Sequence, residues 1–327
     1  MSRNLTLLCI LAVLVTSPVL AQDTSVNVNT ITAPELPLVP VIDGDLSDAA
    51  WANIPVTTVN GSGDDPAPKT PGDLDFSMKA AWDKETNAVY FAITIVDDVF
   101  VNVEGQGSTV GNSGWHNERL EFIINAQNTG QASHGESSQF HTQYIFDLPN
   151  TLADAPNGLV GIPVSTTFTK VPVFEGIDGS IQVPQYPFNL SDDFIESAAM
   201  IRTTDPAATA WAESPVEFTW EIKLVLHEEL YSASEFGYDL NDPVGLEEGF
   251  KEFFNDIGNV IKVLKEGDVI GISPQQNDTD VYATPATRQH QVNTTNVAGN
   301  WDSSAQLTGL ILGPTASTHI MDWSVMD

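Results

Sequence analysis

The sequence predicts an all-β fold, an antiparallel sandwich of two packed sheets with one inserted α-helix. Several segments alternate apolar and polar residues with a period of two, which is typical of strands with one buried face. The clearest of them is 216–226, where every second residue is apolar, from Val216 to Leu226. One stretch has a helical period instead, with apolar residues at Leu246, Phe250, Phe253, Ile257, Val260 and Leu264. An apolar stripe of this kind usually packs on the parent domain. Many strands beside one helix favour a sandwich of the immunoglobulin or jelly-roll kind.

The stretch 76–125 contains the three strands around which the rest of the chain is arranged. Alternation from Phe76 to Trp82 predicts a strand with one buried face. The segment 88–96 is apolar on both faces, so we expect a central strand that is covered on both sides. A loop rich in Gly, Ser and Asn then leads to Trp115, and a third strand is predicted at 120–125.

The first 21 residues have the pattern of a secretory signal. Arg3 is followed by an apolar run and then by small residues, with the cut expected after Ala21. No later apolar run is long enough to span a bilayer, so we expect no membrane insertion. The only cysteine, Cys9, lies within this signal, which excludes disulfides and Cys-ligated metals in the mature chain. We therefore expect a secreted protein, extracellular or periplasmic.

The charge of the chain is strongly negative. Asp and Glu number 44 against 12 Lys and Arg, a net charge of −32 at pH 7. Such a surface repels nucleic acid and anionic membranes, so neither is an expected partner. It suits a soluble protein in saline water, and the alternative use of the acidic groups is calcium binding.

The expected organisation is one domain with insertions. An extended lead-in at 22–38 precedes a domain at 39–313, and a tail follows at 314–327. Insertions are expected near 148–215, which is rich in Pro, Gly, Asn and Asp, and near 227–266, which carries the predicted helix.

Three aspartates near the start of the domain form a candidate calcium loop. Asp43, Asp45 and Asp48 lie close together around Gly44, but the full pattern of an EF-hand is absent. The alternative is a structural turn with Trp51 buried in the core.

No catalytic motif is present. The six histidines do not form the spacing of a hydrolytic metal site, and there is no Gly-x-Ser-x-Gly elbow. Glycosidases need two carboxylates that face the same bond. Glu118 and Glu121 are three residues apart at the start of a strand, so they should face different directions. We therefore expect no enzyme activity.

Several short motifs occur in a characteristic order. Ile42-Asp43-Gly44 is followed by Trp51, then by a strand ending in Trp82-Asp83, an aliphatic strand ending in Asp97-Asp98, and Trp115-x-x-Glu-x-x-Glu-Phe. Gly267-Asp268-Val269-Ile270-Gly271, Arg288, Trp301 and Gly309-Leu310-Ile311-Leu312 come later. In this order the chain resembles the family 9 carbohydrate-binding modules, which are β-sandwich domains often attached to xylanases.

The resemblance implies a sugar site and a partner. Trp115 and Trp301 would clamp the terminal sugar of a polysaccharide, and Glu121 would contact its hydroxyls. Gln275 and Asn277 match the late-strand amides of the family, while His141 stands where the family has a sugar-contacting Arg. The implied partners are a xylan- or glucan-like polysaccharide or oligosaccharide and separate glycoside hydrolases.

Two other functions remain open from the sequence. Related sandwiches bind haem b through Met or His and carry electrons, although no ligand pair is evident here. The third possibility is a purely structural cell-surface domain, in which both Trp residues only anchor loops. No cofactor is certain, and Ca²⁺ is the one candidate.

Overall fold

The computed structural model describes residues 26–62, 72–99, 118–130, 142–147, 164–165, 169–175, 182–183, 195–203, 215–229, 260–280, 288–297 and 306–316. The described part is almost entirely strands, with one short 3₁₀ turn, η1, at Ala49–Trp51. The strands are β1 Thr30–Glu35, β2 Val56–Val59, β3 Gly61–Ser62, β4 Leu74–Asp83, β5 Ala88–Asp97, β6 Arg119–Asn125, β7 Thr142–Asp147, β8 Val164–Ser165, β9 Thr169–Glu175, β10 Gln182–Val183, β11 Ile195–Thr203, β12 Val216–Leu224, β13 His227–Glu229, β14 Val260–Ile261, β15 Val269–Asp278, β16 His290–Asn293 and β17 Thr308–Thr315.

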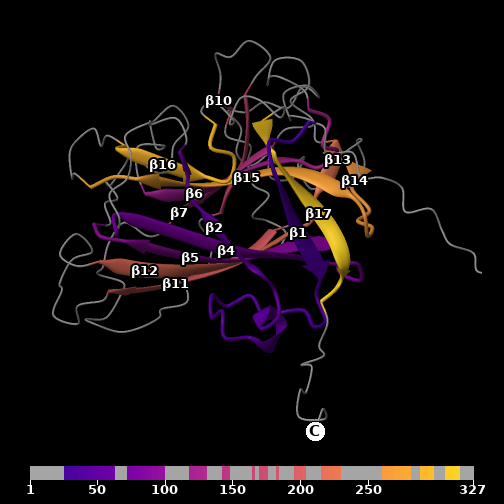
Figure 1. The fold of residues 1–327 in the computed structure, drawn as a ribbon, viewed down its shortest axis with the longest axis horizontal. Helices are drawn as coiled ribbons and strands as arrows, with labels where there is room; N and C mark the ends of the chain where they lie inside the picture. Colours follow the sequence, from indigo (N-terminus) through magenta and orange to yellow (C-terminus); the bar gives the residue numbers. More distant parts are fainter. Residues whose placement is uncertain are drawn as a thin grey trace, which may run out of the picture.

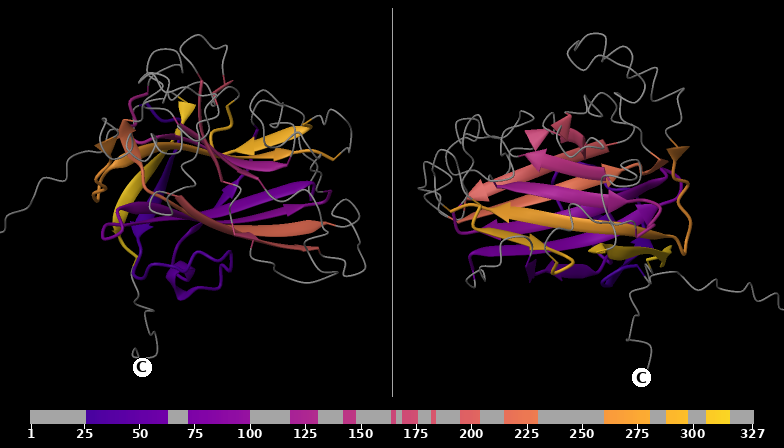
Figure 2. Two further views of the ribbon diagram at one scale, coloured as in Figure 1. Left: turned by 180° about the vertical axis from the view of Figure 1, so that it is seen from behind. Right: turned by 90° about the horizontal axis from the view of Figure 1, so that it is seen from above.

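These strands form the predicted β-sandwich. One layer contains β4, β5, β12 and β11, and the other contains β6, β7, β15 and β16 (Figure 1). The layers are joined along one side, where β17 and β1 continue the hydrogen-bonded order from β15 to β4 (Figure 2). All pairings between described strands are antiparallel except those of β1, which runs parallel to β17 and β4.

The central strand predicted at 88–96 is confirmed as β5, which lies between β4 and β12. Its odd-numbered residues, such as Phe91 and Ile93, are buried in the core between the layers. The alternate residues of β12, from Val216 to Leu224, face the same core, as their period predicted. Aromatic rings from both layers meet there: Phe91 and Phe122 have centroids 4.7 Å apart, and Phe146 lies 5.8 Å from Trp220. Contacts of β5 with β6 and of β7 with β12 therefore hold the two layers together.

The second face of β5 is covered by the segment that precedes β2. Trp51, Leu36 and Ile54 pack there against Tyr90 and Ala92 in a separate hydrophobic cluster. This packing explains why β5 is apolar on both faces.

A buried carboxylate organises that covering segment. Glu221 of β12 accepts hydrogen bonds from the backbone N–H groups of Asp43 and Gly44, both at 2.9 Å, and from Trp51 Nε1 at 2.6 Å. Gly44 has φ +85°, and a Cβ there would lie 2.8 Å from the backbone of Ala199. The Ile-Asp-Gly…Trp motif is therefore a structural turn around Glu221.

The predicted helix is wrong for its last residues, and 246–259 lie outside the described residues. Val260 and Ile261 form β14, which pairs with β13. The run Val260, Ile261 and Val263 is β-branched, which favours extended backbone. Asn87 then holds the following segment, because its side chain bonds to Lys262 O and Leu264 N, each at 2.8 Å. Of the predicted stripe, Leu264 is buried, whereas Val260 is 42% exposed.

The first and last strands extend beyond the domain expected at 39–313. β1 lies within the predicted lead-in, and its Ala33 is part of the main core. β17 continues to Thr315, into the predicted tail. In the insertion expected at 148–215, β11 pairs with β12 over nine residues. Within the described residues, no helix has the length and apolar character needed to cross a membrane.

Candidate functional site

A row of polar side chains lies on one face of the sheet formed by β6, β15 and β16. Leu120, Phe122 and Ile124 of β6 point into the main core. Because side chains alternate along a strand, Glu121 points to the opposite face. Glu121 is the register partner of Gln275, and Asn277 is the register partner of Gln291. The pairing of three strands thus places side chains distant in sequence next to one another.

Hydrogen bonds join three of the predicted sugar-contacting residues. Gln275 donates from Nε2 to Glu121 Oε2 at 2.7 Å, and Asn277 donates from Nδ2 to Glu121 Oε1 at 2.9 Å. Each oxygen of the carboxylate therefore accepts from one amide. Charge-assisted bonds of this kind are the stronger ones in proteins, so they fix the orientation of all three side chains.

Two further residues extend this group through Asn277. Its Oδ1 accepts from Arg288 Nη1 and from Gln291 Nε2, both at 3.0 Å. We call Glu121, Gln275, Asn277, Arg288 and Gln291 the outer network. The resemblance used Arg288 only as a motif residue and did not include Gln291. The apolar Val292 next to Gln291 marks a strand, but sequence alone could not show that this strand pairs with β15.

The outer network is almost completely enclosed. Glu121 is 2% exposed, Gln275 is 1% exposed and Asn277 is fully buried. Gln275 Oε1 is buried and has no hydrogen-bond partner among the described residues. A buried acceptor without a donor is unfavourable, so this atom is a natural place for a ligand hydroxyl to donate.

The predicted aromatic clamp and His141 lie outside the described residues. Thr142, which follows His141 in the sequence, has Ile124 and not Glu121 as its register partner.

Glu118 and Glu121 face different directions, as expected from their spacing. Glu118 accepts from Gln276 Nε2 at 3.2 Å and from the backbone N–H of Thr279. Burial, followed by the nearby carboxylates of Asp97 and Asp278, raises the pKa of Glu118 well above its usual range. The two glutamates belong to separate groups and do not form a pair around one substrate bond.

The candidate calcium loop uses its carboxylates within the turn. Asp43 Oδ1 accepts from Asp45 N at 2.9 Å, Asp45 Oδ1 accepts from Ser47 N at 3.0 Å, and Asp48 Oδ2 accepts from Val41 N at 2.9 Å. Calcium at this loop stays a prediction. Among the described residues, the carboxylates close enough to share one ion lie at the end of the sandwich, around Asp278.

The chain was compared with known proteins. No protein-family model matches it, and no curated protein matches it either. Two similar solved structures are of a family 9 carbohydrate-binding module from Caldicellulosiruptor kristjanssonii, one in complex with glucose and the other with cellotriose. The glucose complex is 15% identical with a TM-score of 0.49, over 90% of this chain and 100% of that chain. The cellotriose complex is 14% identical with a TM-score of 0.48, over 89% of this chain and 97% of that chain.

Proposed function

We propose that this chain is a secreted, non-catalytic carbohydrate-binding protein that holds the end of a xylan- or glucan-like polysaccharide between Trp115 and Trp301. The observation that supports this function best is the outer network. It gathers a carboxylate, three amides and a guanidinium on one face of one sheet, from residues distant in sequence.

The side chains of the outer network suit the hydroxyl groups of a sugar. A hydroxyl both donates and accepts, so it needs carboxylate or amide oxygens on one side and N–H donors on the other. Glu121 supplies a charged acceptor, and Gln275 Oε1 supplies an acceptor that has no donor in the described part of the chain. The amides and Arg288 supply the donors. Because the network is enclosed, the binding of a sugar has to expose it.

Stacking on the aromatic residues and hydrogen bonds to the network both contribute to the affinity in this proposal. Covering ~100 Å² of C–H surface on each ring contributes about 2.5 kcal/mol, or roughly 5 kcal/mol for two rings. Each charge-assisted hydrogen bond adds ~1.5–3 kcal/mol. The loss of rigid-body freedom opposes binding by at least ~4 kcal/mol. The balance corresponds to affinities between about millimolar and micromolar.

The proposed biological role is to assist the breakdown of polysaccharide by separate glycoside hydrolases. The protein itself should release no reducing sugar from xylan or cellulose, because Glu118 and Glu121 point to different faces. Its negative charge makes nucleic acid an unsuitable partner.

Calorimetric titration with xylo- and cello-oligosaccharides tests the proposal. Trp115→Ala should lower the affinity by one to two orders of magnitude and leave the fold intact. Glu121→Gln keeps the shape of the side chain and should weaken binding through the loss of charge. The matched control is Glu85→Gln, in the exposed turn between β4 and β5, which should bind like the unchanged protein.

Three results would contradict the proposal. Unchanged affinity in a folded Trp115→Ala protein would show that the clamp is misplaced. No binding to any oligosaccharide would favour a structural surface domain. An absorbance band of the purified protein near ~400 nm would favour haem binding instead, although Met78 is buried in the apolar core.

A further inference from the structure

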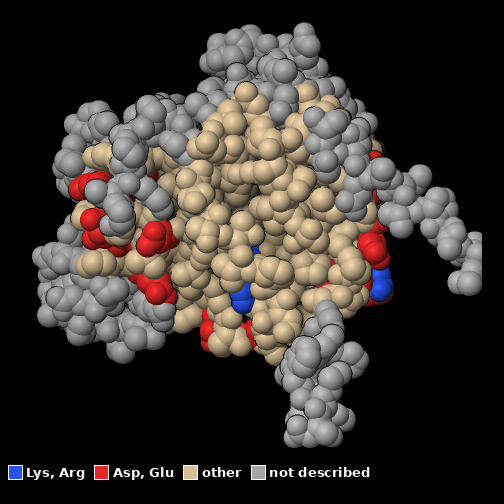
Figure 3. Space-filling model, in the orientation of Figure 1, with Lys and Arg blue, Asp and Glu red and all other residues tan. Residues whose placement is uncertain are grey.

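A second group of charged side chains lies at one end of the sandwich. Asp97 is the last residue of β5, and Asp278 is the last residue of β15, so the two belong to different layers. Register pairing places Asp97 opposite Leu74, next to Asp73, and Asp278 opposite His290. Acidic side chains gather at the left-hand end of the molecule, the end to which β16 extends, and no basic side chain is visible among them (Figure 3).

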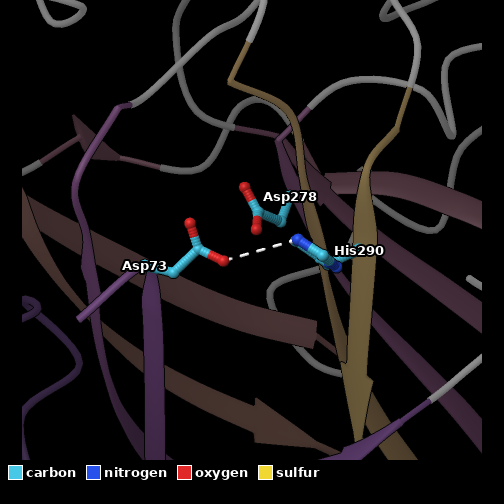
Figure 4. Close-up of side chains that lie close together, drawn as sticks. All are labelled: Asp73, Asp278 and His290. Atoms are coloured by element: carbon cyan, nitrogen blue, oxygen red, sulfur yellow. Dashed lines mark ion pairs between the residues drawn. The ribbon is translucent and has the colours of Figure 1, made fainter. Parts of the chain in front are cut away.

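The carboxylates of this group are close enough to share one ion. Asp97, Asp278 and Asp280 each offer an oxygen, and these oxygens all lie within 4.8 Å of one another. Two overlapping groups meet the same criterion, Asp73 with Asp98 and Asp280, and Asp73 with Asp278 and His290. Asp278 and His290 point toward Asp73 across the gap between the layers, and His290 Nε2 lies 3.4 Å from Asp73 Oδ2 (Figure 4).

In the described part of the chain, the central carboxylates have few of the donors that a buried carboxylate needs, although Asp97 Oδ1 accepts from the backbone N–H of Val99 at 3.1 Å. Asp97 and Asp278 are both fully buried. Asp97 Oδ2, both oxygens of Asp278 and Asp280 Oδ1 are buried with no hydrogen-bond partner among the described residues. An ionised carboxylate in this state loses its hydration without replacement, which is strongly unfavourable. Burial, followed by the neighbouring carboxylates, accordingly raises the pKa of Asp278 to about 8. A cation placed among these oxygens would offset both their lost hydration and their mutual repulsion.

We propose that Asp97, Asp278 and Asp280 bind a divalent cation, Ca²⁺, which links the two layers at this end of the sandwich. All three ligands are hard oxygen donors, and Ca²⁺ takes six to eight oxygens at about 2.3–2.6 Å in flexible geometry. Asp73 and Asp98 are near enough to complete the shell together with water. His290 then orients Asp73 from outside the shell. The ion would join the end of β5 to the end of β15.

Titration of the chelator-treated, full-length chain with CaCl₂ tests this site, with heat of binding and melting temperature as the two readouts. We expect saturable binding and a rise in melting temperature with Ca²⁺. Asp278→Asn preserves the size of the side chain and should weaken Ca²⁺ binding at least tenfold. Asp280→Asn, at a half-buried position, provides a second variant if Asp278→Asn does not fold. Asp45→Asn is the control, since it removes an acidic group from the turn near Trp51.

Each possible result of the Ca²⁺ titrations either supports or overturns the proposed site. Loss of Ca²⁺ binding in Asp278→Asn or Asp280→Asn, with binding retained in Asp45→Asn, supports it. An unchanged protein that binds no Ca²⁺, or one that loses binding only in Asp45→Asn, overturns it. Tighter binding of Mg²⁺ than of Ca²⁺ overturns the choice of ion, because Mg²⁺ requires a smaller octahedral site. Sugar affinity is measured separately, so failure of either site leaves the other one testable.

Discussion

The outer network differs from the acidic end group, which contains Asp73, Asp97, Asp98, Asp278 and Asp280. Both groups take consecutive residues from the same strand, β15. Gln275 and Asn277 of β15 point to the outer face, where they saturate the carboxylate of Glu121 with amide donors. Gln276 and Asp278 point inward, and Asp278 has no donor for either oxygen among the described residues. Both carboxylates are almost fully buried. Burial alone therefore does not decide whether a carboxylate stabilises the fold; the donors around it do.

The largest expected effect on stability comes from the loss of Glu121, whose two oxygens both accept hydrogen bonds. Glu121→Ala should lower the free energy of unfolding by about 3–5 kcal/mol, because Gln275 and Asn277 both lose a charged acceptor worth ~1.5–3 kcal/mol each. Urea unfolding at equilibrium measures the difference. Glu85→Ala, in the exposed β4–β5 turn, should stay within ~0.5 kcal/mol of the unchanged protein. A similar small change in Glu121→Ala would show that the network does not stabilise the fold.

For Asp278, whose oxygens have no donors among the described residues, we expect the opposite effect: its replacement should stabilise the fold. The pKa of Asp278 is about 8 in the folded chain, against an ordinary value of 3.8. Between these values the folded chain binds more protons than the unfolded chain, so the contribution of Asp278 to stability falls as the pH rises from about 4 to 8. In chelator at pH 7, Asp278→Asn should therefore be more stable than the unchanged protein, by up to about 4 kcal/mol.

The pH and the ion together provide the control for that prediction. At pH 3 the two proteins should melt nearly alike, because the carboxyl is largely protonated in both the folded and the unfolded chain. Added Ca²⁺ at pH 7 should stabilise only the unchanged protein. The titratable groups that face Asp278 are Asp73, Asp97, Asp98, Glu118, Asp280 and His290. If Asp278→Asn is less stable than the unchanged protein in chelator at pH 7, Asp278 has donors that the structure does not place.

The sequence predicted the outer network better than the acidic group, for a physical reason. Alternation identifies which face of a strand each residue occupies, and the family resemblance named Glu121, Gln275 and Asn277 together. The acidic group depends on which strand ends meet across two layers. Asp97 and Asp278 each end a strand, but only the observed topology brings β5 and β15 to the same end of the sandwich.

The predicted helix shows a different limit of sequence patterns. The apolar residues at 246–264, Val260 and Leu264 included, have a helical period. Leu264 is indeed buried, but it reaches the core from a non-helical segment held by Asn87. The side-chain amide of Asn87 bonds to the backbone of this segment, as a neighbouring strand would. Asn87 is 177 residues away from Leu264 in the sequence, so no local pattern predicts the contact.

The smallest expected effect tests whether the outer network acts as a unit. Gln291→Leu removes one neutral hydrogen bond to Asn277 Oδ1, which still accepts from Arg288 at 3.0 Å. The free energy of unfolding should fall by about 1 kcal/mol, as for a typical single bond. Combined with Glu121→Ala, the change should not be additive, because both residues bond to Asn277, and a coupling of at least ~0.5 kcal/mol is expected. Combined with Asp278→Asn, on the opposite face and without a shared partner, the effects should add to within ~0.5 kcal/mol. Equal coupling in both double variants would mean that the two faces of β15 form one polar system.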